Sequence, residues 1–293
     1  MNNMWSLISV IRLNPFFWVI IAIGIITGYF REALMLFAIV FIHELGHASV
    51  AVHYGWKIRK IELLPFGGVA EIEDSGNKPI KQEVLLVLAG PLQHVWMIGA
   101  SYLFAGTAIW SQSNHELFLW HNLVILCFNL LPVLPLDGGR LVQLWFMERL
   151  AYKKAHKSSI FSSVIALCLI CIATLFLPFH LNLYVVLFFL VINNYLEWKQ
   201  RHYRFMRFLT EREALPTIHS PETELTVSPS LIVRDAVNLL RRGHSHLFTM
   251  QPGHGQVTEK DVLQALFNRK LTEPIKDLID KPPRVNSIRT KVQ

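Results

Sequence analysis

The chain has 293 residues, of which 52% are hydrophobic and 17% are charged, and its mean hydropathy is positive. This balance excludes an ordinary soluble enzyme and predicts a polytopic membrane protein with a small soluble remainder. The formal net charge of +7 is concentrated in a few loops, without interleaved groups that could read or stack on bases. Nucleic acid is therefore not an expected partner.

Apolar segments predict six membrane spans. In chain order they are Phe16–Phe30, Ala33–His53, Val84–Ile109, Leu117–Met147, Ser158–Leu177 and Leu181–Tyr195. No small-residue cleavage site follows the first segment, so we expect an anchor and not a removable signal. Lys and Arg cluster after the second, fourth and sixth segments, and the loops after the third and fifth contain neither. By the positive-inside rule, both termini are expected in the cytoplasm.

The second predicted span contains the sequence HELGH. Because residues i and i+4 share a helix face, His43 and His47 can bind one metal ion, and the carboxylate of Glu44 can move protons beside them. A chance pentapeptide and a hydrogen-bonded histidine pair in a bundle core are the alternatives. An ionised carboxylate inside a membrane span costs on the order of 3 kcal/mol, which favours a catalytic site.

The loop after this span, residues 57–74, alternates in hydrophobicity on both sides of a turn at residues 65–68. This pattern predicts a β-hairpin with an apolar tip close to the membrane. Its edge could pair with an extended substrate. A hairpin that only caps the helices fits the pattern equally well.

The third predicted span contains AGPLQH, residues 89–94. Gln93 and His94 are polar groups at membrane depth, so we expect them to face the interior of the bundle. Packing is the favoured role of this stretch, and support of a nearby site is the alternative.

The fourth predicted span is interrupted by NLLPVLPLDGGR, residues 129–140. Its prolines and glycines cannot continue a regular helix, and unwound backbone at membrane depth requires a watery cavity or burial in protein. Asp137 lies in this segment, and packing of adjacent spans would bring it to the two histidines. Two imidazoles and a carboxylate suit Zn²⁺ with an open fourth position. Alternatively, Asp137 caps the restarted helix. Asn129 is a candidate for binding a substrate carbonyl or oxyanion, with packing as its alternative.

HELGH and NLLPVLPLDGG together closely resemble the site-2 family of intramembrane metalloproteases, and FGG in the hairpin and AGPLQH fit the same pattern. The resemblance covers the predicted membrane domain. It implies that His43, His47 and Asp137 bind one zinc ion and that Glu44 is the catalytic base. His94 departs from the pattern, because many relatives have asparagine there, so no catalytic role follows for it.

Within that family the chain most resembles a branch that acts in sporulation. This resemblance implies a membrane-tethered substrate, namely a sporulation sigma-factor precursor that is cut near the cytoplasmic face. It also implies inhibitory membrane proteins as partners and a location in a membrane that surrounds the developing spore.

The C-terminal part predicts an interfacial helix and linker at residues 198–215, because this segment is basic, aromatic and followed by prolines. Residues 216–293 predict a small α/β domain that resembles a single CBS motif, a module that commonly binds adenine nucleotides. The resemblance places a ribose contact on Thr258 and Asp261, and it implies ATP as a ligand and pairing with a second copy. An ordinary place for Asp261 in the first turn of a helix is the alternative. The predicted elements are a helix at Ser230–Arg242, a strand at His246–Met250 and a helix at Thr258–Phe267.

The sequence thus predicts an α-helical polytopic membrane protein with a zinc metalloprotease domain at residues 1–197. The rival is a membrane metal-ion transporter that uses the same His and Asp cluster, because broken helices and intramembrane ionisable groups also mark ion pathways. The absence of a visible internal repeat and the place of Glu44 beside the first histidine favour the protease. A non-catalytic nucleotide sensor would leave the HELGH sequence without a role.

Overall fold

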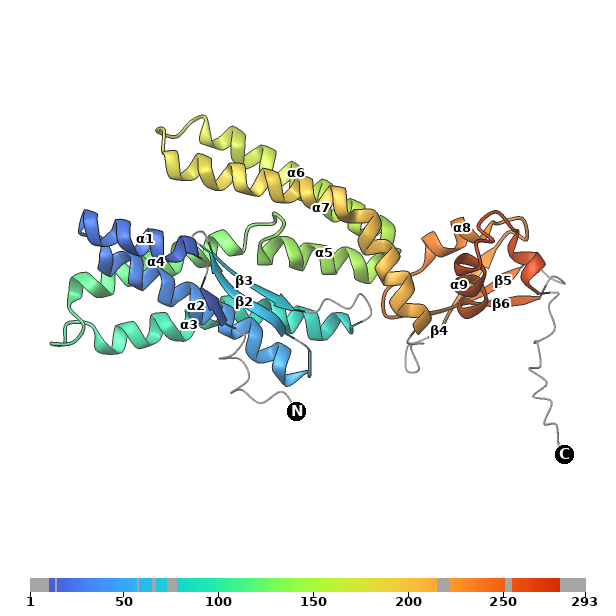
Figure 1. The fold of residues 1–293 in the computed structure, drawn as a ribbon, viewed down its shortest axis with the longest axis horizontal. Coiled ribbons are helices and arrows are strands. Elements are labelled where there is room, and N and C mark those ends of the chain that lie inside the picture. Colours follow the sequence, from blue (N-terminus) through green and yellow to red (C-terminus); the bar gives the residue numbers. More distant parts are fainter. Residues whose placement is uncertain are drawn as a thin grey trace. The chain divides into compact units, whose positions relative to one another are not determined.

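The computed structural model describes residues 11–13, 15–56, 58–64, 67–72, 78–214, 222–250 and 255–279 (Figure 1). The chain divides into two compact units. The membrane unit comprises residues 1–146 and 156–201, and the C-terminal unit comprises residues 147–155 and 202–293. The predicted domain boundaries at residues 197 and 215 remain predictions.

The membrane unit is mainly helical. Its elements are β1 (Ile11–Leu13), α1 (Pro15–Thr27), α2 (Phe30–His53), β2 (Ile58–Leu64), β3 (Gly67–Ile72), α3 (Ile80–Phe104), α4 (Gln112–Asn129), α5 (Asp137–Arg149), α6 (Tyr152–Thr174) and α7 (Leu181–Ala214), of which the last three extend into the C-terminal unit. Among the described helices, α2, α3, α6 and α7 are long and apolar enough to cross a membrane. The chain is therefore a membrane protein.

The prediction of six spans stays a prediction. Helix α1 has 13 residues, which at about 1.5 Å per residue reach about 20 Å, less than the roughly 30 Å hydrocarbon core. Helix α4 has 18 residues, and its first half is rich in polar side chains.

The predicted interruption of the fourth span is confirmed. Helix α4 ends at Asn129 and α5 begins at Asp137, so the chain leaves helical geometry between them. The first turn of α5 lies against this unwound segment, because a Cβ atom at Gly138 would be 2.5 Å from the carbonyl oxygen of Leu131. Only glycine fits such an approach without displacing backbone.

The predicted hairpin is also confirmed, since β2 and β3 pair antiparallel from Ile58 opposite Ile72 to Leu64 opposite Gly67. Of the turn predicted at residues 65–68, Gly67 and Gly68 already belong to β3, and residues 65–66 lie outside the described residues. The sequence did not predict β1, a strand of three residues that pairs in parallel with β2. In the sheet order β1-β2-β3, strand β3 forms an edge of the described sheet.

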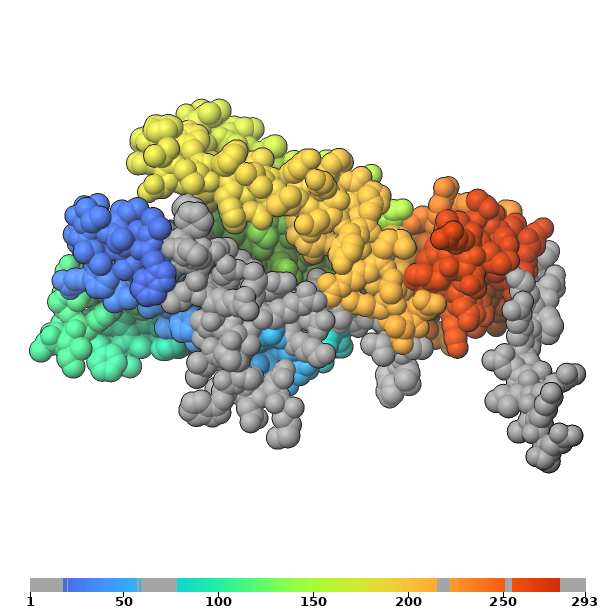
Figure 2. Space-filling view, in the orientation of Figure 1, coloured from blue at the N-terminus to red at the C-terminus, as the bar shows by residue number. Residues whose placement is uncertain are grey.

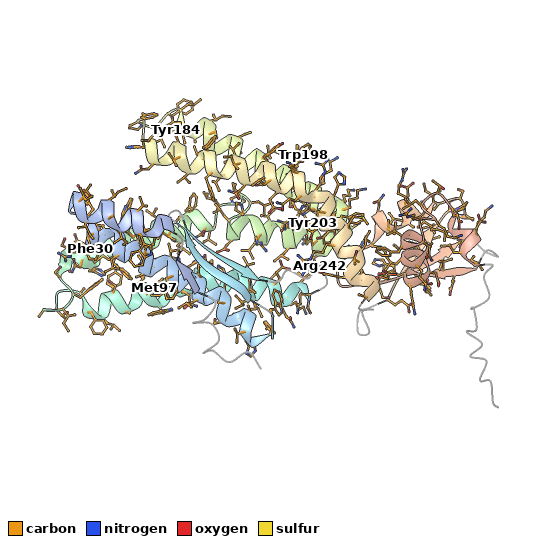
Figure 3. The ribbon with its side chains drawn as sticks, viewed as in Figure 1. Phe30, Met97, Tyr184, Trp198, Tyr203 and Arg242 are labelled. Carbon is orange, nitrogen blue, oxygen red and sulfur yellow. The ribbon has the colours of Figure 1, made fainter. Side chains whose placement is uncertain are left out.

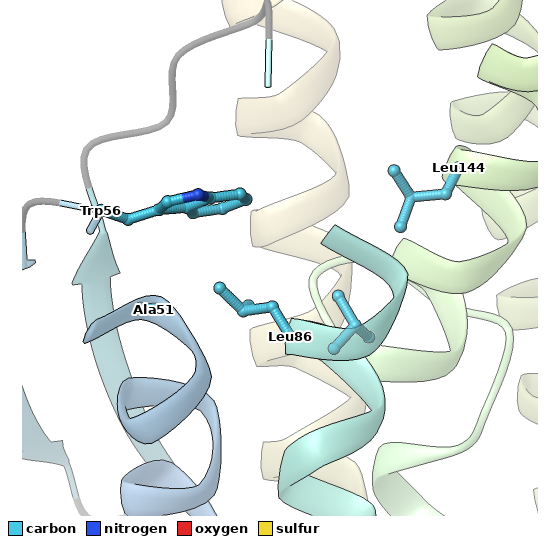
Figure 4. Packing of buried hydrophobic residues seen from close by; sticks show 5 residues of the cluster. Ala51, Trp56, Leu86 and Leu144 are labelled. Atoms are coloured by element: carbon cyan, nitrogen blue, oxygen red, sulfur yellow. The ribbon is translucent and has the colours of Figure 1, made fainter. Parts of the chain in front are cut away.

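A buried apolar cluster holds the helices that carry the candidate site. Ala51 and Trp56 contact Leu86 and Val87 of α3 and Leu144 of α5 (Figure 4). Because lipid is as apolar as these side chains, close packing stabilises this contact more than exclusion of water does. The cluster fixes α3 and α5 against the C-terminal end of α2.

Helices α6 and α7 form a hairpin whose inner faces meet Val133 of the unwound segment through Leu167, Leu187 and Leu190. Their outer surface, yellow in Figure 2, exposes large apolar side chains such as Phe161. An apolar exterior suits contact with lipid.

The helix predicted separately at the start of residues 198–215 is continuous with α7, which ends at Ala214. Trp198 and Tyr203 both belong to this part of α7 (Figure 3), and both are more than half exposed. The guanidinium of Arg201 lies 4.3 Å from the centre of the Trp198 ring. Aromatic and cationic side chains of this kind are typical of a membrane–water interface.

The C-terminal unit contains β4 (Glu222–Val227), α8 (Val233–Ala236), the 3₁₀ turn η2 (Val237–Leu239), β5 (Ser245–Met250), β6 (Gln256–Thr258), α9 (Glu259–Phe267) and the 3₁₀ turn η3 (Ile275–Leu278). The sheet has the order β4-β5-β6, with β4 parallel and β6 antiparallel to β5. The predicted strand and second helix are confirmed, and β4 and β6 were missed. The CBS resemblance stays a prediction.

The first helix predicted for this unit was too long. Regular α-helix covers only Val233–Ala236, because the chain turns extended at Leu240, whose carbonyl accepts a 2.9 Å hydrogen bond from the Tyr152 amide. The Tyr152 ring stacks on Phe208 of α7 with 4.1 Å between centres. This tertiary contact overrides the helical periodicity of the sequence.

Candidate metal centre

Three side chains from two helices converge inside the membrane unit. His43 and His47 come from α2, and Asp137 is the first residue of α5. The Oδ2 atom of Asp137 lies 3.1 Å from His43 Nε2 and 3.4 Å from His47 Nε2, and the two Nε2 atoms are 3.1 Å apart. The structure thus brings together the three ligands that the sequence predicts, as a group that could hold a metal ion.

The outer nitrogen of His47 shows which atom is free to bind a metal. His47 Nδ1 lies 2.8 Å from the carbonyl oxygen of Leu86, and because a carbonyl can only accept, Nδ1 carries the hydrogen. In the neutral ring the Nε2 lone pair then faces the Asp137 carboxylate. Lone pairs that converge in a buried place repel one another unless a cation lies between them. The donor set therefore fits zinc.

Gly90 of α3 makes room for the histidine rings. A Cβ atom at this position would overlap His47 Nε2 and lie 2.8 Å from His43 Cε1. The sequence assigned the AGPLQH stretch a packing role. The structure shows that its glycine gives the imidazole rings the space in which they meet Asp137.

Glu44 lies beside the first histidine of this centre, and Asn129 is the last residue of α4. Glu44 directly follows His43 on α2 and is 8% exposed, so a group that can accept a proton is buried in the same helical turn. Asn129 is half-buried at the end of α4, where the unwound segment begins. The predicted roles of both residues remain predictions.

Two further polar residues extend from the centre, and both are fully buried. His94 Nε2 lies 3.1 Å from His43 Nδ1, and His94 Nδ1 lies 3.0 Å from Asn122 Oδ1. His94 therefore faces the interior as predicted, and it contacts the candidate centre. Sequence reasoning missed Asn122, although the polar pair His121-Asn122 within a mostly apolar run was a signal.

The unwound segment is held by α6 and α7 through both backbone groups of Leu134. Its amide donates to Ser163 Oγ at 2.8 Å, and its carbonyl accepts from Asn194 Nδ2 at 2.7 Å. Ser163 also donates to Asn194 Oδ1, so the two buried side chains act together. Backbone that leaves the helix inside a membrane needs such partners. Ser163 and Asn194 thus form a clamp on Leu134, and this clamp holds the segment that leads directly to Asp137.

Replacing Asn194 with leucine should loosen this clamp. The Leu134 carbonyl would lose its partner, at a cost of about 1–3 kcal/mol, and we expect zinc content and melting temperature to fall in the purified protein. The matched control is Asn193→Leu, because within the part of the chain that the structure describes Asn193 bonds only to the Phe189 carbonyl of its own helix. Equal zinc content and melting temperature in the two variants would show that the clamp does not position Asp137.

The two residues with a predicted ribose contact bond to each other in the C-terminal unit. Thr258 caps α9 by accepting from the Asp261 amide, and its hydroxyl donates to Asp261 Oδ2 at 2.6 Å. This reciprocal capping box agrees with the alternative in which Asp261 is a first-turn helix residue. A nucleotide contact stays a prediction. Beside the pair, the buried Glu259 forms an ion pair with Arg212 and accepts a hydrogen bond from His246 Nδ1, a network that the sequence did not indicate.

Comparison with known proteins gives a family match over the part of the chain that holds the centre. The model of peptidase family M50 matches residues 31–113 and 107–172. Stage IV sporulation protein FB of Bacillus subtilis (strain 168) is 38% identical over 286 residues, which cover 93% of this chain and 96% of that protein.

Two further matches come from Methanocaldococcus jannaschii. A zinc metalloprotease of that organism is 35% identical over 148 residues, which cover 49% of this chain and 39% of that protein. The solved structure of its site-2 protease superposes with a TM-score of 0.46 at 29% identity, over 65% of this chain and 89% of that one. The long match to the Bacillus protein and the family match are sufficient to assign the family. The chain therefore belongs to peptidase family M50, the site-2 proteases, and is a metalloprotease.

Proposed function

We propose that this metalloprotease uses zinc to hydrolyse a peptide bond of a membrane-tethered protein. The observation that carries the proposal is the convergence of His43, His47 and Asp137 beside the buried Glu44, on a helix long and apolar enough to span a membrane. A buried carboxylate next to such a cluster suits hydrolysis, because peptide cleavage requires a group that moves protons.

In the proposed reaction, His43 and His47 would hold zinc through their imidazole rings and Asp137 would hold it through its carboxylate. Bound zinc supplies Lewis-acid chemistry, which lowers the pKa of a water molecule and polarises a carbonyl. Glu44 accepts a proton from the attacking water and delivers it to the leaving amine. Asn129 donates to the carbonyl oxygen on which negative charge develops.

We infer that the substrate is extended where it is cut, because a helical peptide group is already hydrogen-bonded within its own helix. Strand β3 is the proposed docking element. It lies at an edge of the described sheet, and addition of a strand supplies main-chain hydrogen bonds without a strict sequence requirement.

The similarity to a sporulation protein supports a role in sporulation. We propose a sporulation sigma-factor precursor as the substrate, cleavage near the cytoplasmic face, inhibitory membrane proteins as partners and a location around the developing spore. The alternation of basic loops with loops that lack Lys and Arg supports cytoplasmic termini. For the C-terminal unit we propose regulation by ATP and pairing with a second copy, supported by its β-α-β-β-α order.

The test reconstitutes the purified full-length protein in liposomes with a membrane-tethered sigma-factor precursor. We expect a shortened product that disappears when a zinc chelator is added and returns when zinc is restored. The rival transporter predicts zinc flux into the same liposomes and no peptide product. Flux without cleavage would replace the protease mechanism with transport.

A further inference from the structure

A chain of hydrogen bonds runs from His43 across α3 to α4. Its far end is Asn122, whose Nδ2 donates to the carbonyl of Phe118 at 2.9 Å, within the same helix. The Oδ1 atom of that amide faces His94 Nδ1 at 3.0 Å, and His94 Nε2 faces His43 Nδ1 at 3.1 Å. Asn122 and His94 are both 0% exposed, so solvent does not take part in this series of hydrogen bonds.

The direction of each bond follows from the fixed end. The Phe118 carbonyl can only accept, so the amide nitrogen of Asn122 points to it and the amide oxygen points to His94. A flipped amide would set two acceptors against each other. Since an amide oxygen also only accepts, His94 Nδ1 carries the hydrogen. In a neutral ring His94 Nε2 is then an acceptor, and the buried ring has no carboxylate partner in the described hydrogen bonds that would favour a charged form.

The last bond of the chain reaches His43. Because His94 Nε2 accepts, His43 Nδ1 must donate, and the His43 lone pair lies on Nε2. That is the atom 3.1 Å from Asp137 Oδ2. The opposite tautomer would place a hydrogen on Nε2, between the atoms that bind a metal.

We propose that Asn122 and His94 are positioning residues that select the metal-binding tautomer of His43. The inference rests on the proposed zinc centre and adds to it how the tautomer of one ligand is fixed. The tautomers of the two histidines are fixed by different partners. His47 bonds directly to the backbone of α3 at Leu86, whereas His43 depends on two side chains from separate helices. Outer partners of metal-bound histidines typically change metal affinity by about 10- to 100-fold.

The first test measures zinc affinity of the full-length protein by chelator competition. Asn122→Leu should weaken zinc binding by about 10- to 100-fold. The control is His121→Leu, because His121 is the preceding residue on α4 and its one hydrogen bond among the described residues is to the Leu117 carbonyl of its own helix. Its zinc affinity should match that of the wild type.

A second pair of variants keeps the proposal testable if Asn122→Leu fails to fold. In His94→Gln the amide oxygen can accept from His43 Nδ1 and the amide nitrogen can donate to Asn122, so wild-type zinc affinity is expected. His94→Leu can do neither and should lose affinity as Asn122→Leu does. Equal zinc affinities of the Gln and Leu variants would overturn the proposed hydrogen-bond relay from Asn122 through His94 to His43.

A spectroscopic measurement separates a tautomer effect from general loosening. In metal-free protein labelled with ¹⁵N histidine, the wild-type His43 ring should show an unprotonated Nε2 and a protonated Nδ1. In Asn122→Leu the two tautomers should mix. If wild type binds zinc and Asn122→Leu shows wild-type affinity and an unchanged spectrum, the relay is wrong and the zinc centre stands. If wild type binds no zinc, the proposed function itself fails.

Discussion

Glu44→Gln should abolish peptide hydrolysis and leave the zinc content unchanged. Glutamine keeps the size of the side chain but cannot accept the proton of the attacking water, and loss of a general base typically costs at least 10²- to 10⁴-fold in rate. The measurement pairs product formation in liposomes with metal analysis of the same preparation. We expect zinc near one per chain and no product.

The matched control for this variant is Glu32→Gln. Glu32 lies in the first turn of the same helix, far along the axis from the histidines, so its loss removes a charge from α2 without reaching the centre. It should cleave at the wild-type rate. Cleavage by Glu44→Gln at a comparable rate would remove Glu44 from the mechanism. In contrast, His47→Ala should lose both zinc and activity.

Gly90→Ala should disrupt the metal centre by adding one methyl group. The new Cβ atom would lie 2.5 Å from His47 Cε1, which is closer than such atoms can approach, so an imidazole ring or helix α3 must shift. Overpacking of this kind costs about 1–3 kcal/mol. If the clash displaces the histidine rings, the same free energy is lost from zinc binding. Zinc affinity then drops by about 5- to 150-fold, and the cleavage rate falls with it.

The same helix offers a control with the same chemical change. Gly99 lies on α3, and a Cβ atom there would have no atom of another described element within 4 Å. Gly99→Ala should therefore retain wild-type zinc affinity and activity, with equal or slightly higher helix stability. Equal zinc affinity in the two alanine variants would show that the rings do not need the space at Gly90.

Much of the candidate site could be read from the sequence because it depends on local geometry. The spacing of His43 and His47 places both on one face of any α-helix. The two prolines shortly before Asp137 favour a break in the helix, because proline lacks the amide hydrogen and its ring clashes with the preceding turn. Alternation around the turn predicted the β2–β3 hairpin in the same way. Each of these features is decided by residues within a few positions of one another.

The tertiary structure decided which atoms meet. The approach of Asp137 to the histidines, the space at Gly90 and the bonds from Asn122 through His94 all depend on how α2, α3, α4 and α5 pack. The clamp on Leu134 depends in addition on α6 and α7. Helical periodicity describes one helix at a time, whereas a hydrogen bond between helices requires two of them to lie at the right distance and rotation. Packing of the whole bundle sets that distance and rotation, and no short stretch of the sequence encodes them.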